Sequence, residues 1–170
     1  VNGAVSVSEN ATASITTVSL DGYNGADLGD TGTDLDALTT LSLANSAGAA
    51  AVGSAGTALA LTVDNVLHNI DLDAGTAGAT TTDLTITTAN ADSAFGVVAA
   101  AVTDLSVGGS NDLDLSVGST LTNLETATVT GSAGLEIDFT GLLNPPSVDT
   151  TGPTGDSKVT MDGTLATFTG

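Results

Sequence analysis

A five-residue pattern returns along most of the chain at nearly constant spacing. In each copy, apolar side chains occupy the third and fifth positions and alternate with Thr, Ser, Asp or Ala. Such alternation is typical of a β-strand with one buried face. The copies begin at residues 16, 39, 59, 82, 103 and 125, so successive copies are 23, 20, 23, 21 and 22 residues apart. One strand in every 20 to 23 residues indicates a solenoid, in which each coil stacks on the one before it.

A second strand is predicted in each coil, roughly eight to eleven residues after the first. Its copies also alternate apolar and polar residues, and they cover residues 69–73, 93–97, 111–115 and 134–138. The interior must be narrow, because the chain has 3 Phe, 1 Tyr and no Trp. Together these features predict an all-β fold, a parallel β-solenoid (β-helix) with about 20–23 residues and two short strands per coil. We expect it to be right-handed, as parallel crossovers generally are.

The whole chain, residues 1–170, reads as one solenoid segment. Residues 1–15 are predicted to form an incoming coil, residues 16–143 the regular coils, and residues 144–170 the terminal coils after an interruption at Pro145 and Pro146. Proline cannot donate to an interior β-ladder. Neither end shows a capping pattern, so we expect this segment to belong to a longer protein or to stack on other copies.

The charge balance excludes several functions. The chain has 20 acidic residues against one basic residue, Lys158, and a formal net charge of −19. Such a surface repels phosphate, so nucleic acid is not expected as a partner. Self-repulsion on this scale favours bound cations or screening by salt.

No apolar run approaches the roughly 18 residues of a membrane span, and no export leader is evident at the start. The sequence has no Cys and hence no disulfides.

Oxygen ligands at the turns point to calcium. Ca²⁺ takes six to eight oxygens from Asp, Asn and backbone carbonyls, and nitrogen and sulfur ligands are nearly absent here. We predict three calcium-binding sets: Asp21, Asn24, Asp27 and Asp30 in a glycine-rich loop; Asp71 and Asp73; and Asn111, Asp112 and Asp114. None of them matches an EF-hand or a complete glycine–aspartate repeat.

The stacking of the copies has a further consequence for charge. Aligned from their first residues, the copies place Asp83 and Asp104 in one column with Thr40 and Thr126. Like charges one strand apart, about 4.8 Å, repel each other. Either another copy separates these two carboxylates or a cation joins them, and the sequence leaves both open.

Catalysis and ice binding are both disfavoured. The only histidine is His68, and the chain has neither Cys nor Arg, so we predict that it is not an enzyme. An ice-binding face needs a regular Thr-x-Thr ladder. In the alignment above, equivalent pairs are Thr40/Ser42, Ala60/Thr62 and Asp83/Thr85, and this ladder is irregular.

In repeat style and composition the chain resembles the Caulobacter-type surface-layer proteins. The residues that carry the resemblance are 1–5, 16–20 with the Gly/Asp loop that follows, 38–43 and 166–170. Those proteins are exported by type I secretion, and their calcium-dependent RTX β-solenoids cover the outer cell surface. The resemblance therefore implies a secreted, non-enzymatic lattice component of the cell surface (S-layer). The family's Gly-Gly-x-Gly-x-Asp nonapeptide is missing here, so its calcium ligands cannot be transferred to this chain.

We therefore expect an extracellular structural protein, a self-assembling surface-layer or matrix component stabilised by calcium. Its expected partners are other copies of itself, with a cell-surface polysaccharide as a further candidate. Two alternatives remain open: the stalk of a secreted biofilm adhesin of the RTX type, and a polysaccharide-active β-helix.

Overall fold

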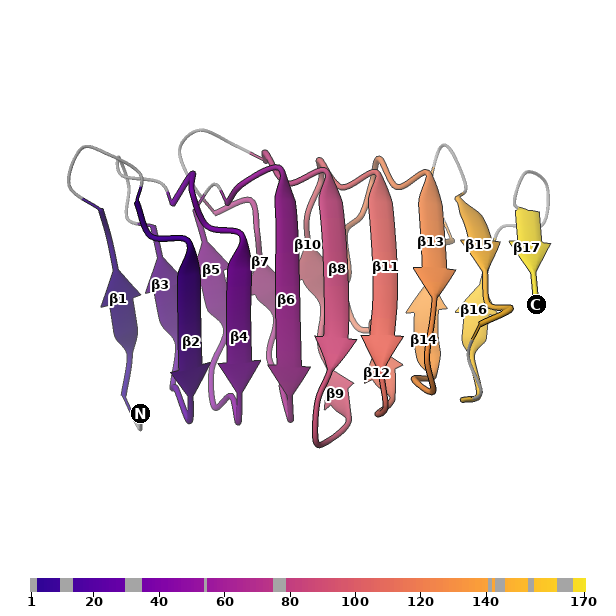
Figure 1. The fold of residues 1–170 in the computed structure, drawn as a ribbon, viewed down its shortest axis with the longest axis horizontal. Coiled ribbons are helices and arrows are strands. Elements are labelled where there is room, and N and C mark those ends of the chain that lie inside the picture. Colours follow the sequence, from indigo (N-terminus) through magenta and orange to yellow (C-terminus); the bar gives the residue numbers. More distant parts are fainter. Residues whose placement is uncertain are drawn as a thin grey trace.

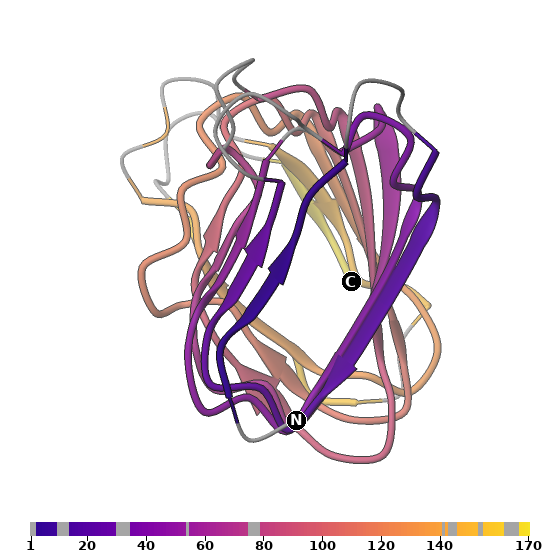
Figure 2. The same ribbon diagram turned by 90° about the vertical axis from the view of Figure 1, so that its left-hand side faces the viewer.

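The chain winds into a parallel β-solenoid, as the repeat predicted (Figure 1). The computed structural model describes residues 3–9, 14–29, 35–53, 55–74, 79–140, 142, 146–152, 155–161 and 167–170. Across these ranges the regular structure is all β, with no helix, and no segment could cross a membrane as a helix. Successive coils overlie one another when the molecule is viewed along its length (Figure 2).

Three sheets form the walls of the solenoid. The front sheet has eight strands, in the order β17-β15-β13-β11-β8-β6-β4-β2. They are β2 (Thr17–Asp21), β4 (Thr40–Ala44), β6 (Ala58–Asp64), β8 (Asp83–Thr88), β11 (Asp104–Gly109), β13 (Thr126–Val129), β15 (Ser147–Asp149) and β17 (Thr167–Thr169).

The other two sheets share the remaining strands. The rear sheet consists of β1 (Val5–Val7), β3 (Ala26–Leu28), β5 (Ala50–Val52), β7 (Ile70–Asp71) and β10 (Val97–Val98). The lower sheet consists of β9 (Ser93–Ala94), β12 (Leu113–Asp114), β14 (Leu135–Asp138) and β16 (Lys158–Thr160). Two strands per coil is thus the rule. The coil that begins with β8 has three, because β10 ends the rear sheet while β9 begins the lower sheet.

Small apolar side chains fill the interior in columns, one residue from each coil. In the front sheet the central column runs Val18, Leu41, Leu61, Ile86, Val107 and Val129, all of them buried. Strict alternation along each strand places the intervening polar residues outside. Of the four aromatic rings, those of Tyr23, Phe95 and Phe139 are buried inside, whereas Phe168 in β17 is 53% exposed.

The register departs from the sequence alignment at one step. Ala60 of β6 pairs with Thr85 of β8, and Asp83 pairs with Ala58. Asp83, Asp104 and Thr126 share a column as predicted, but Thr40 does not belong to it. A shift of two residues leaves every side chain on the same face of the sheet. Apolar periodicity therefore could not reveal it.

Asparagine side chains join the coils at the corner that follows the front sheet. Asn45 and Asn65 each come directly after a strand and have positive φ angles of 50° and 53°. The Asn45 amide group donates to Asp21 Oδ1 at 2.8 Å, and Asn65 donates to Asn45 Oδ1 at 3.0 Å. Asn tolerates this left-handed conformation better than most residues. Asn45 therefore serves both the backbone turn and the stacking of three coils.

Replacing Asn45 by Gly is expected to lower the free energy of unfolding by about 1–3 kcal/mol. Glycine accepts the positive φ, so the loss reports the two side-chain hydrogen bonds rather than backbone strain. Urea unfolding followed by circular dichroism measures it. The control is Asn123→Gly: Asn123 is exposed and donates one hydrogen bond, to Ala100 O at 2.7 Å. If the two variants lose equal stability, the stacked side chains of Asp21, Asn45 and Asn65 have no special role in stability.

Candidate functional site: an acidic groove on the lower sheet

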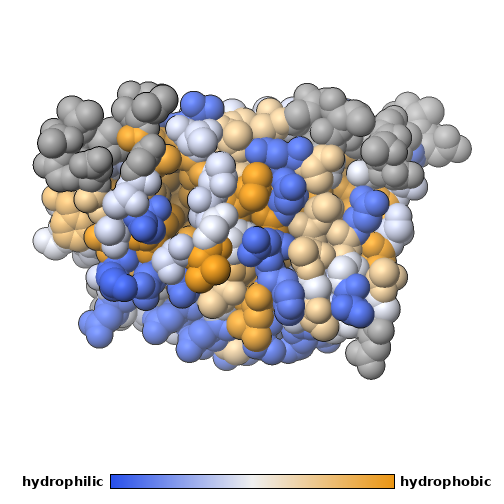
Figure 3. Space-filling model, turned by 180° about the vertical axis from the view of Figure 1, so that it is seen from behind, coloured by the Kyte–Doolittle hydropathy of each residue, from blue (hydrophilic) through white to orange (hydrophobic). Residues whose placement is uncertain are grey.

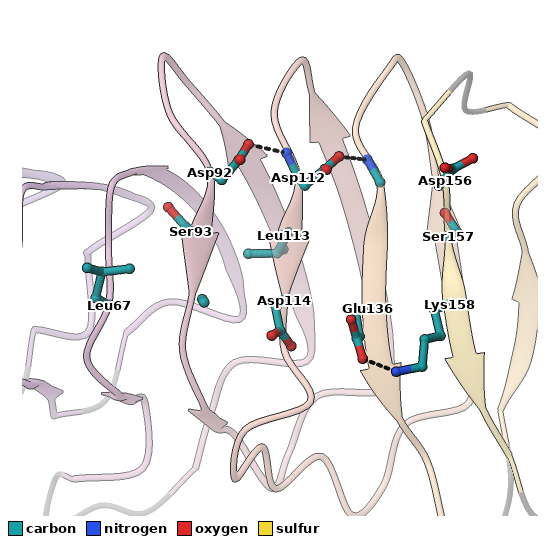
Figure 4. Close-up of a pocket in the computed structure, with 12 residues that line it drawn as sticks. Leu67, Asp92, Ser93, Asp112, Leu113, Asp114, Glu136, Asp156, Ser157 and Lys158 are labelled. Atoms are coloured by element: carbon teal, nitrogen blue, oxygen red, sulfur yellow. Dashed lines mark hydrogen bonds and ion pairs between the residues drawn. The ribbon is translucent and has the colours of Figure 1, made fainter.

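A groove of about 350 Å³ runs across the outer side of the lower sheet (Figure 4). One end of the groove lies beside β9, the first strand of the lower sheet. Leu67, from the preceding coil, lines this end and is 57% exposed. Ser93 and Leu113 lie in its floor, and acidic side chains from successive coils border it. Around the groove, on the side of the molecule opposite the front sheet, polar and apolar surface is mixed (Figure 3).

One row of carboxylates follows the corner that precedes the strands of the lower sheet. Asp92 Oδ1 accepts a hydrogen bond from the Asp112 amide at 2.9 Å, and Asp112 Oδ1 accepts one from the Gly134 amide at 3.1 Å. The next rung is Asp156. A side chain at position 134 would lie 2.7 Å from Asp112 Oδ1, so glycine is needed there. The carboxylates of Asp92 and Asp112 thus each join their coil to the following one.

A second row lies on the strands themselves. Asp114, Glu136 and Lys158 are neighbours in register on β12, β14 and β16. The Lys158 ammonium group donates to Glu136 Oε1, and this contact raises the pKa of Lys158. Their side chains are 71% and 40% exposed, so solvent screens the ion pair and it contributes little to stability. The one basic residue of the chain therefore stands at one end of the groove.

The structure places the described aspartates of the first predicted calcium set in different sheets. Asp21 ends β2 in the front sheet and accepts a hydrogen bond from Asn45, whereas Asp27 lies in β3 of the rear sheet. Asn24 is exposed in the turn between them. Asp30 lies outside the described residues.

The second predicted set is brought together, but its oxygens already bind backbone amides. Asp71 Oδ1 accepts from the Asp73 amide at 2.9 Å. Asp73 Oδ2 in turn accepts from the Ala100 amide at 2.7 Å, in the next coil. Both side chains are half-buried. These contacts support the turn after β7 and its attachment to the following coil.

The third set is divided between the corner and the groove. The Asn111 amide group donates to Asn90 O at 3.3 Å, which extends the corner ladder. Asp112 and Asp114 border the groove, and Asp114 Oδ1 accepts from the Ser116 amide at 2.8 Å. Of the predicted ligands that the structure describes, Asp112 and Asp114 are the two that line the groove.

The acidic side chains of the described residues are spread out rather than clustered. Among them no three His, Cys, Asp or Glu side chains converge on one point. The acids of the groove instead follow one another at the spacing of the coils, about 4.8 Å. This arrangement concentrates negative charge along a line and attracts mobile cations.

The remaining acids of the groove were missed because only apolar positions were aligned. Asp92, Asp112 and Asp156 occupy equivalent corners, with Gly134 between the last two. Their sequence spacings are 20, 22 and 22 residues, the same period as the strands. Applying that period to acidic residues would have found the row.

Comparison with known proteins assigns no relatives to the chain: no family model, curated protein or solved structure matches it.

Proposed function

We propose that this β-solenoid is a structural segment of an extracellular surface layer or matrix, that it self-associates, and that calcium stabilises it. The observation that carries the proposal is the unbroken parallel ladder of the front sheet, from β2 to β17. The two outermost strands, β2 and β17, each have one edge that pairs with no other strand of this sheet. Such an edge can pair with further β-structure. A stack of such coils is a scaffold that can be extended without a new fold. The resemblance to surface-layer proteins supports the extracellular location.

Self-association is tested on the purified chain by analytical ultracentrifugation and negative-stain electron microscopy. With millimolar Ca²⁺ we expect filaments or sheets, and with excess EGTA we expect small species. Persistent monomers in both conditions would contradict self-assembly and would favour the adhesin stalk, in which another domain does the binding. Release of sugars from acidic polysaccharides would instead support a polysaccharide-active β-helix.

Calcium enters the proposal as a counter-ion that bridges stacked carboxylates rather than as an ion in a cage. The net charge of −19 and the two rows of the groove support it. At about one hundred times its dissociation constant, a ligand that binds only the folded state adds roughly 2.7 kcal/mol of stability. For a chain of this length that corresponds to a rise of about 5–10 °C in melting temperature.

The measurement is thermal unfolding in CaCl₂ and in NaCl of equal ionic strength. Calcium is expected to exceed the NaCl effect, and the Asp92→Asn/Asp112→Asn double variant should lose most of that excess. The matched control is Asp27→Asn/Asp83→Asn, which removes the same charge from other walls of the solenoid. Equal effects of the two salts would overturn the calcium proposal and leave only screening. Equal losses in the two double variants would show that calcium acts outside the groove.

A further inference from the structure

Hydroxyl side chains cover the outer face of the front sheet in two adjacent columns. By register, the first column holds Thr17, Thr40, Ala60, Thr85, Ser106 and Thr128. The second column, two residues further along each strand, holds Ser19, Ser42, Thr62, Thr87 and Gly108. Of these eleven positions, nine are Thr or Ser.

The observed register creates this regularity. Aligned by sequence, the rung after Ala60/Thr62 would be Asp83/Thr85, which breaks the ladder with a charge. In the structure that rung is Thr85/Thr87, and Asp83 moves to the margin of the sheet. The objection that the ladder is irregular therefore does not hold for the folded chain.

The hydroxyl groups of these columns are free to bind something else. None of the nine makes a hydrogen bond to another protein group in the described part of the chain. In contrast, the Thr hydroxyls at the corner before the strands are used internally: those of Thr82 and Thr103 donate to the carboxylates of Asp83 and Asp104 at 2.8 Å. Most of the nine are exposed, and three are half-buried. Threonine also has a stiff χ1 angle, so its hydroxyl and methyl groups are held in place before binding.

The two columns are also neutral on a strongly acidic protein. None of the 20 acidic residues occupies a position in these columns from β2 to β13. The nearest acids are Asp149, which follows Thr128 in the first column on β15, Asp83 and Asp104 on one side, and Asp21 and Asp64 on the other. A basic partner or a metal ion would be drawn to those margins and to the groove. The face itself fits a neutral ligand.

The ligand must also be flat and periodic. Side chains repeat about every 4.8 Å across the strands and about every 6.6 Å along them, in a parallel ladder without gaps from β2 to β13. A crystalline lattice can contact such an array at many points together, whereas a single small molecule would contact only one or two rungs. The oxygen atoms of ice repeat at comparable spacings. Crystalline polysaccharide offers flat sugar rings, but neither column contains an aromatic side chain to stack on them.

From this geometry we propose that the outer face of the front sheet, formed by these two columns, binds the surface of ice. Hydroxyl groups and methyl groups together order the water layer that joins the lattice. This role does not depend on self-assembly or calcium, because one chain carries the complete face.

The test uses the purified full chain at micromolar concentration in EGTA, with ice recrystallisation and thermal hysteresis as readouts. We expect the chain to slow recrystallisation and to produce measurable hysteresis. Thr85→Tyr, at the centre of the first column, should weaken binding to ice at least tenfold and reduce both readouts accordingly. The matched variant is Ser6→Tyr, which adds the same side chain at an exposed position of the rear sheet. It should keep the activity.

Circular dichroism and melting confirm that both variants fold. Should Thr85→Tyr unfold, Thr85→Val replaces it, since this change removes the hydroxyl and nearly preserves the shape. Wild-type chain that behaves like an inert protein of equal concentration would overturn the proposal. So would equal losses in the two Tyr variants, or retention on crystalline cellulose powder without any effect on ice.

Discussion

Replacing Leu61 by Ala is expected to lower the free energy of unfolding by about 2–5 kcal/mol. Leu61 is 1% exposed and lies in the middle of β6, between Leu41 of β4 and Ile86 of β8. In a solenoid each coil is held only by its two neighbours. A cavity in a central coil therefore weakens its contacts with both neighbouring coils. More distant coils do not touch it and cannot restore the lost stability. Urea unfolding monitored by circular dichroism measures the loss.

The control for this variant is Leu67→Ala, which removes the same atoms from a side chain that is 57% exposed. A substitution outside the core usually changes stability by no more than about 0.5 kcal/mol. Similar losses in the two variants would contradict the description of the column as the source of stability. They would indicate instead that Leu67 is buried against another copy in solution.

The architecture was predictable because two independent periods agree. Alternation within each copy fixes which side chains face inward, and the recurrence of the copies fixes the stacking. The second strands were also found, since Leu113 and Leu135 begin β12 and β14 within the predicted ranges. The division of the second wall at β9 and β10 was not predicted. Residues 93–97 were treated as one strand, and nothing in their pattern shows that their two ends join different sheets.

Register was the weakest part of the prediction. The five-residue copies align Asp83 with Ala60, but the structure aligns Asp83 with Ala58. Both alignments bury the same side chains, so the hydrophobic effect does not distinguish them. This single step decides whether the outer face carries an interrupted or a nearly continuous row of hydroxyls.

In the charged column at the margin of the front sheet, neutral hydroxyl groups lie beside two stacked carboxylates. Asp83 and Asp104 are paired in register, so their carboxylates are neighbours. Thr126 donates to Asp104 Oδ1 at 2.5 Å, and Thr103 donates to its other oxygen at 2.8 Å. These hydrogen bonds hold the pKa of Asp104 below its ordinary value. Hydroxyl donors thus support the ionised form of Asp104.

The candidate ligands show that an aspartate at a corner can have more than one role. Asp73 and Asp112, two of the predicted calcium ligands, accept hydrogen bonds from backbone amides of the next coil. An Asp at a corner has two uses that look the same in sequence: it can bind an ion, or it can satisfy an amide that the ladder leaves unpaired. Only the path of the neighbouring coil distinguishes them.

Gly109→Ala is expected to destabilise the protein by roughly 2–6 kcal/mol, as backbone strain and overpacking act together. Gly109 ends β11 with a φ of 113°, a conformation that residues with a side chain rarely adopt. A Cβ atom there would collide with the carbonyl oxygen and the hydroxyl of Thr88 and lie 2.7 Å from its nitrogen. The Thr88 hydroxyl is buried, donating to Asn111 O at 2.7 Å and accepting from the Asn111 amide at 3.1 Å.

Comparison with Gly118→Ala separates the two causes. Gly118 also has a positive φ, 77°, but its added Cβ would meet nothing within 4 Å, so only the backbone term of about 1–2 kcal/mol applies. If Gly109→Ala loses more stability than Gly118→Ala, the difference measures the close packing of β11 on Thr88. If the two variants melt alike, adjacent coils have room to separate at this corner, and the interlocked turn is not what holds the stack in register.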